Sequence, residues 1–181
     1  MANYLTKLSF VIPTEGKDPT AFFEFVNALE EACEAQLEIQ DNEPVDIEGP
    51  EGWPDPTEMM TDFDFNMGFH ATMDTDVREA KIWIRDEDGV PNTDLLIRLV
   101  ELAVEKMDLQ SPVSFQWANT CSRPLLDGFG GGIAVIARDA DGQVQTRSQA
   151  TAHMLDALIQ EIVMSHAAPA EDSTPSSGGM I

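Results

Sequence analysis

AKIWIRDEDGVPNTDLLIRLVELAVEKM, residues 80–107, combines both kinds of regular structure in one stretch. Its first half alternates apolar with larger polar or amphipathic residues, the period of a strand buried on one face. The inward residues would be Ala80, Ile82 and Ile84, and the outward ones Lys81, Trp83 and Arg85. After a turn, Asn92 or Thr93 can cap a helix, because its side-chain oxygen can accept a free backbone N–H. That helix carries an apolar stripe of Leu96, Leu99, Val100, Ala103 and Met107.

The same two periods recur along the chain. Alternation predicts strands at 4–12, 65–73, 77–85 and 113–118 and in GIAVIARDADG, residues 132–142. Spacings of three and four predict helices over 21–37 and, after a Ser148 cap, over 149–164, where the stripe is Ala150, Met154, Leu158 and Ile162. The turn between 65–73 and 77–85 is short, so these strands are predicted to form a hairpin.

The predicted order of elements is therefore βαββαββα. Hairpins between helices favour an α+β two-layer sandwich, an antiparallel sheet of about five strands with the helices mainly on one face. A parallel doubly wound sheet would need strict alternation of strands and helices, which the chain lacks. One domain is expected over 1–165, with a long acidic loop at 38–63 that holds four prolines and two glycines, and a disordered tail at 166–181.

The charge of the chain is strongly negative and unevenly distributed. The sequence has 33 acidic and 10 basic residues, a net charge of -23, and the 60 residues from 18 to 77 hold 17 Asp and Glu and neither Lys nor Arg. Direct binding to nucleic acid is disfavoured, because phosphate contacts need clustered cations. A basic protein partner is favoured instead. The candidate contact residues are Asp41, Glu43, Asp46, Glu48, Glu51, Asp55 and Glu58.

No run of roughly 18 apolar residues is present to span a membrane, and the start of the chain has no basic leader followed by an apolar block. A cytoplasmic protein with no membrane contact is therefore the expectation. The two cysteines, Cys33 and Cys121, are expected to be reduced thiols.

Two similar tetrapeptides, DEDG at 86–89 and DADG at 139–142, contain closely spaced carboxylates of the kind found in calcium loops. Neither continues with the further oxygen ligands and the glutamate that such a loop requires, so turns are the favoured interpretation. His70, His153 and His166 have no metal-ligand spacing and are expected at the surface. No metal site and no cofactor are predicted. The elements around the two tetrapeptides suggest a duplicated strand–strand–helix unit.

The connection WANTCSRPLLDGFGGG, residues 117–132, gathers a thiol, a cation and several glycines. A reactive or ligand-binding pocket could use Cys121, Arg123, Asp127, Gly130, Gly131 and Gly132. The glycines lack the order of a phosphate loop and precede a strand, so a bend or close backbone contact is the favoured interpretation. No histidine accompanies the thiol to activate it.

A resemblance is carried by SFQWANTCSRPLLDGFGGGIAVIA, residues 114–137. It resembles a segment of small acidic proteins of bacteriophages and plasmids, in which W-A-x-x-C-S-x-P is followed by F-G-G-G and an apolar strand. The resemblance covers 24 residues and implies an origin in a mobile element, without transferring any catalytic residue.

Trp83, between Lys81 and Arg85 on the face opposite the predicted core, is a second binding candidate. That face is either available to a partner, including a second copy of the chain in a homodimer, or covered by the third predicted helix.

Three functional hypotheses follow. The preferred one is a non-catalytic acidic binding protein of a phage or plasmid, which engages a basic host protein by imitating nucleic acid or inhibiting host defence. The second is a small-molecule-binding protein or enzyme with its pocket at Cys121 to Gly132. The third is an acidic protein adapted to a saline habitat.

Overall fold

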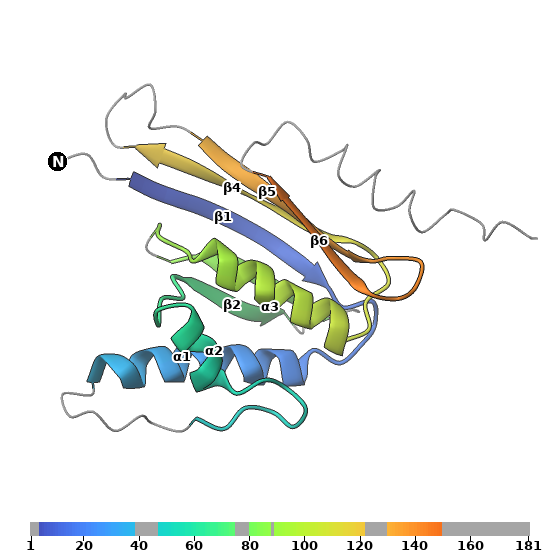
Figure 1. Cartoon of the computed structure of the whole chain (residues 1–181), viewed down its shortest axis with the longest axis horizontal. Helices are drawn as coiled ribbons and strands as arrows, with labels where there is room; N and C mark the ends of the chain where they lie inside the picture. Colours follow the sequence, from blue (N-terminus) through green and yellow to red (C-terminus); the bar gives the residue numbers. More distant parts are fainter. Residues whose placement is uncertain (1–3, 39–46, 75–79, 88, 122–129, 150–181) are drawn as a thin grey trace, which may run out of the picture.

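The computed structural model describes residues 4–38, 47–74, 80–87, 89–121 and 130–149, and the α+β fold that they form is shown in Figure 1. The elements follow the order β1 (Tyr4–Pro13), α1 (Thr20–Glu38), α2 (Pro56–Asp62), β2 (Phe69–Asp74), β3 (Lys81–Asp86), α3 (Thr93–Lys106), β4 (Val113–Cys121), β5 (Gly130–Arg138) and β6 (Val144–Gln149). The predicted fold class, an antiparallel sheet with helices on one face, is confirmed.

The six strands form one sheet in the order β2-β3-β1-β4-β5-β6, and every neighbouring pair is antiparallel. The predicted hairpin is present, since β2 pairs with β3 and places Ala71 opposite Ile84. The first strand lies in the middle of the sheet, where it pairs with β3 along Ser9–Pro13 and with β4 along Tyr4–Leu8. The two halves of the chain are therefore joined through β1.

Helix α2 and strand β6 were not predicted from the sequence, and a physical reason explains why each forms. Helix α2 lies inside the predicted loop at 38–63, where Asp55 caps it, Pro56 begins it, and Met59 and Met60 are buried. Strand β6 has the polar sequence VQTRSQ and is an edge strand held by its backbone pairing with β5. It raises the strand count from about five to six.

The second strand begins later than predicted, at Phe69 instead of residue 65, because the chain first turns back at the end of α2. Asp64 and Phe65 have positive φ values of 55° and 48°. The amide of Phe65 donates to the carbonyl of Met60, an ending typical of helix C-termini. The predicted third helix at 149–164 and the tail at 166–181 lie outside the described residues, apart from Gln149 in β6.

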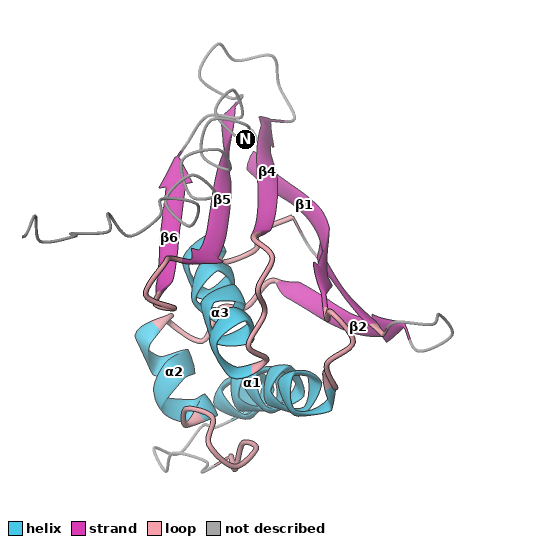
Figure 2. Cartoon of the chain, turned by 90° about the vertical axis from the view of Figure 1, so that its right-hand side faces the viewer, coloured by secondary structure: helices cyan, strands magenta, loops and turns pink. Residues whose placement is uncertain are grey.

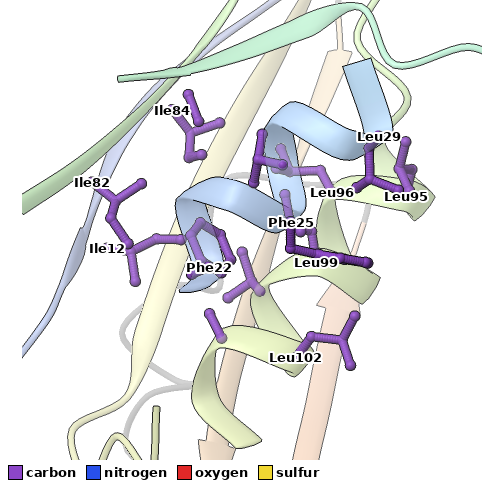
Figure 3. Packing of buried hydrophobic residues seen from close by; sticks show 14 of the residues in the cluster. Ile12, Phe22, Phe25, Leu29, Ile82, Ile84, Leu95, Leu96, Leu99 and Leu102 are labelled. Carbon is purple, nitrogen blue, oxygen red and sulfur yellow. The ribbon is translucent and has the colours of Figure 1, made fainter. Parts of the chain in front are cut away.

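The core lies between the sheet and the helices (Figures 2 and 3). Helix α1 supplies Phe22, Phe25 and Leu29, all fully buried. Helix α3 contributes Leu95, Leu96 and Leu99, and the sheet contributes Ile12, Ile82 and Ile84. Full burial of one such side chain stabilises the fold by roughly 1.5–3 kcal/mol. The cluster therefore fixes α1 and α3 on the same face of the sheet.

Candidate functional site

The helical side of the molecule carries a concentration of exposed carboxylates, which we call the acidic layer. Its members lie on α1, on the segment 47–55 and on α2, and are Glu24, Glu31, Glu34, Glu48, Glu51, Asp55, Glu58 and Asp62. The sequence places no Lys or Arg between Lys17 and Arg78. Arg98 of α3 lines a hollow with Glu58 and Asp62, but the acidic layer holds more carboxylates than neighbouring bases, so their fields add and the layer presents a negative potential to solvent.

The structure describes four of the seven residues predicted for the acidic surface. Glu48, Glu51, Asp55 and Glu58 are all exposed. Asp55 also has a structural role, because its Oδ1 accepts the backbone N–H of Glu58 at 2.9 Å and caps α2. Asp41, Glu43 and Asp46 lie outside the described residues.

His70 on β2 is placed between two carboxylates, an arrangement that the sequence analysis missed. Its Nδ1 lies 3.0 Å from Glu30 Oε1 on α1, and its Nε2 lies 2.7 Å from Glu87 Oε1 beyond β3. Hydrogen bonding to Glu30, and then to Glu87, raises the pKa of His70 above its ordinary value. The three residues are far apart in the sequence, so no local pattern could have revealed the contact. The cluster joins α1 to the edge of the sheet.

Trp83 lies on the sheet face opposite the helices, as predicted, and is 43% exposed. Its indole Nε1–H donates to Ser9 Oγ at 2.8 Å, and the guanidinium carbon of Arg85 lies 5.4 Å from the ring centroid. The cross-strand neighbour Val11 is 46% exposed. Together with the exposed Lys81, these residues form a cationic and aromatic patch. We call Val11, Lys81, Trp83 and Arg85 the tryptophan patch.

The glycines of the predicted pocket loop are explained by the pairing of β4 with β5. Gly131 has a φ of 155°, and a Cβ there would clash with the carbonyl oxygen of Trp117. A Cβ at Gly132 would clash with the Trp117 ring. Both positions therefore require glycine for the close approach of the two strands.

Of the other residues predicted for the pocket, the structure describes Gly130 and the backbone of Cys121. Cys121 ends β4, but its side chain, Arg123 and Asp127 lie outside the described residues, whereas Gly130 begins β5. An open hollow of about 510 Å³ adjoins Gly130 and Trp117. The charged residues on its described wall, Lys7 and Asp86, bind each other at 2.6 Å.

Asp86 and Asp139, the first residues of the two acidic tetrapeptides, accept hydrogen bonds within the fold. Burial would raise the pKa of Asp86, but hydrogen bonds from Lys7 and from the backbone N–H of Leu8 outweigh it and lower the pKa. Asp139 accepts the backbone N–H groups of Asp141 and Gln143, both at 2.9 Å, and so closes a turn. Within the part of the chain that the structure describes, no group of three potential ligands could hold a metal ion.

A second hollow, of about 460 Å³, lies between α3 and the β5–β6 hairpin. Its charged side chains, Arg98, Glu101, Glu105 and Arg138, come from both elements. Arg98 pairs with Glu101 at 3.1 Å, and Arg138 is bonded to backbone carbonyls. These charges already have partners within the fold.

Comparison of the chain with protein-family models, with curated proteins and with solved structures finds no match. None of the helices in the described ranges is long and apolar enough to cross a membrane.

Proposed function

We propose that this chain is a non-catalytic binding protein whose acidic layer engages a basic protein in the cytoplasm of a host cell. The observation that supports the proposal is the acidic layer itself: eight exposed carboxylates on α1, the segment 47–55 and α2, in a stretch of sequence without Lys or Arg. A surface of this kind attracts cationic partners over long distances and accelerates their association.

We propose further that the acidic layer imitates the charge of nucleic acid. Duplex DNA carries one negative charge per roughly 1.7 Å of its axis, and the proteins that bind it present clustered Lys and Arg. The acidic layer offers a carboxylate field to such a surface. The resemblance of residues 114–137 to acidic proteins of phages and plasmids implies an origin in a mobile element, and inhibition of a host defence protein would suit the acidic chemistry.

The saline-habitat alternative predicts charge spread over the whole surface. Exposed acids also occur outside the acidic layer, at Asp94, Glu105 and Asp141. Among the described bases, Lys81 and Arg85 lie in the tryptophan patch, whereas Arg98 of α3 lines a hollow beside Glu58 and Asp62 of the acidic layer. The pocket alternative rests on the 510 Å³ hollow beside Gly130, and it requires Cys121 to reach that hollow. The tryptophan patch is the second candidate contact of the proposed function, either for the same partner or for a second copy of the chain in a homodimer.

The test compares two triple variants of equal net charge. One neutralises the acidic layer by Glu48→Gln, Glu51→Gln and Asp62→Asn, and the control neutralises exposed acids elsewhere by Asp94→Asn, Glu105→Gln and Asp141→Asn. Each protein is immobilised and exposed to a bacterial lysate at low salt, and the retained proteins are identified and quantified. Duplex DNA is then added as a competitor.

We expect the parent and the control to retain the same nucleic-acid-binding proteins, and DNA to release them. The acidic-layer variant should retain several-fold less, because three charges of the acidic layer are removed. Equal losses in the two variants would contradict the proposal, since net charge alone would then explain retention. Retention that DNA does not affect would contradict the nucleic-acid mimicry.

A further inference from the structure

Lys81, Trp83 and Arg85 alternate along β3 and are all exposed on the sheet face opposite the helices (Figure 2). The strand pairing places Trp83 between Thr72 of β2 and Val11 of β1, and both of these neighbours are exposed. The indole is 43% exposed, although its single N–H donor is already bonded within the fold. The part of the ring that meets water therefore offers apolar contact to a partner.

Lys81 and Arg85 differ from most of the other described bases in their ion pairs. Bases elsewhere in the described ranges lie 2.6–3.8 Å from a carboxylate oxygen, and these are Lys7, Lys17, Arg98, Lys106 and Arg138. No ion pair between described residues involves Lys81 or Arg85. The guanidinium carbon of Arg85 instead lies 5.4 Å from the centroid of the Trp83 ring. In a chain with 33 acids and 10 bases, these two cations form a local positive surface.

We propose that the tryptophan patch binds an extended acidic segment of a partner protein, in which two carboxylates flank an apolar side chain. Lys81 and Arg85 are four residues apart on one strand, so their Cα atoms are separated by roughly 13 Å. An extended segment has the same period. Its first and fifth residues can therefore present carboxylates to the two cations, while the third packs on Trp83 and Val11. Asp74 lies opposite Lys81 in the β2–β3 pairing, so Arg85 contributes more of the charge recognition.

The composition of the tryptophan patch disfavours two other occupants. A two-fold dimer through the patch would place Lys81 and Arg85 of one copy against the same cations of the other. A nucleic-acid strand would bring a charge with every nucleotide to a protein of net charge -23, and it binds best to a series of stacking aromatics. Within the described ranges, Trp83 is the only exposed aromatic side chain. A short segment with two carboxylates is repelled far less by the net charge.

This contact is independent of the proposed function, because it uses neither the acidic layer nor a basic partner. Binding of short labelled peptides is measured by fluorescence anisotropy at about 0.15 M salt, where a Debye length of about 8 Å weakens the field of the acidic layer at the opposite face. The test peptide contains Asp, Phe and Asp at alternate positions with Thr between them, and the control peptide has Asn in place of each Asp. The parent should bind the Asp peptide at least about tenfold more tightly than the Asn peptide.

Two variants remove the proposed contacts separately. Trp83→Ala removes the ring, and Lys81→Gln with Arg85→Gln removes the two charges. Each should weaken binding of the Asp peptide about tenfold or more, because an aromatic anchor and its flanking cations contribute most of the affinity of a small contact. Lys17→Gln with Lys106→Gln is the matched control, since it removes the same charge from exposed positions outside the patch. This control should bind the Asp peptide as the parent does.

Three outcomes would overturn the proposal. The first is a parent that does not prefer the Asp peptide, or patch variants that bind it as tightly as the parent. The second is tighter binding of a labelled oligothymidine that Trp83→Ala abolishes, which would identify single-stranded nucleic acid as the occupant. The third is a parent dimer in sedimentation that Trp83→Ala converts to a monomer. The triple variant Glu48→Gln, Glu51→Gln and Asp62→Asn should bind the Asp peptide at least as tightly as the parent, so a failure of the acidic layer leaves this contact unaffected.

Discussion

His70 connects three separate parts of the chain at the scale of single side chains. Glu30 on α1 and Glu87 after β3 hold its two ring nitrogens, while Arg85 lies opposite it in the β2–β3 pairing. Glu34 lines the same small hollow. Because the two carboxylates bind the imidazolium, the pKa of His70 is raised and the folded state favours the protonated form.

We therefore predict a stability contribution from His70 that depends on pH. It is fully present below the unfolded pKa of about 6.5 and is lost as pH rises through the higher pKa of the folded state. The free energy of unfolding in urea should be measured for the parent and His70→Gln at about pH 5.5 and about pH 8.5. The parent should exceed the variant by more at the lower pH. An equal difference at both values would show that the ion pairs contribute nothing.

Gly131 lies where β5 closely approaches Trp117 of β4. Gly131→Ala should lower the free energy of unfolding by about 2 kcal/mol or more, because the new Cβ meets both a positive φ and the carbonyl of Trp117. Gly142→Ala is the matched control, since Gly142 also has a positive φ, of 78°, but open space around it. Its loss should be about 1 kcal/mol. Equal losses in urea unfolding would mean that the close approach to β4 is unimportant.

At the scale of elements, α3 is held at both ends by polar side chains. Asn92 Oδ1 accepts the backbone N–H of Leu95 at 3.1 Å and caps the start, so the structure selects Asn92 from the two predicted caps, Asn92 and Thr93. At the other end, Arg138 of β5 donates through Nη2 to the carbonyls of Val104 and Glu105, both at 3.0 Å. Its Nη1 donates to Gly142 O at 2.7 Å. One cation thus joins the negative end of α3 to the β5–β6 turn.

Replacing this guanidinium should loosen the contact between α3 and the hairpin. Arg138→Lys should lower the free energy of unfolding by about 1–3 kcal/mol, because an ammonium cannot reproduce the planar set of donors. Arg98→Lys is the control, since Arg98 is exposed and its pair with Glu101 lies on the same helix, and its loss should stay below about 1 kcal/mol. Denaturant unfolding of both variants gives the comparison. Similar small losses would show that the bonds of Arg138 are exchanged for water without effect.

For the whole molecule, the net charge of -23 opposes the compact state. Folding brings carboxylates of the acidic layer closer together than they are in the unfolded chain. The described ion pairs of Lys7, Lys17, Arg98 and Arg138 are made with Asp86, Asp108 and Glu101, which are not members of the acidic layer.

We therefore predict that salt stabilises the protein. The thermal midpoint should rise between about 0.01 M and about 0.15 M sodium chloride, because the Debye length falls from roughly 30 Å to about 8 Å and the repulsion is screened. Differential scanning calorimetry at the two concentrations measures the shift. The triple variant Glu48→Gln, Glu51→Gln and Asp62→Asn should show a smaller rise than the parent. A midpoint that falls with salt would indicate that attractive ion pairs dominate.

Much of the element content follows from local periodicity. Residues 4–12, 21–37, 77–85 and 94–107 were predicted as strand, helix, strand and helix, and each element lies within a few residues of its predicted position. The period-two and period-three-to-four patterns that identify such elements depend only on neighbours along the chain. For the same reason, the uncompensated charge of residues 18–77 was evident before any fold was considered.

The sequence alone determined the fold class, the hairpin of β2 with β3, a helix cap at Asn92 or Thr93, and the acidic character of residues 18–77. Only the tertiary structure decided the place of β1 between β3 and β4, the edge strand β6, the short helix α2 and the His70 cluster. These features depend on contacts between residues far apart in the chain. A polar strand such as β6 forms because β5 offers it backbone hydrogen bonds, and α2 forms where Met59 and Met60 find an apolar surface to cover. Such partners are present only once the rest of the chain has folded.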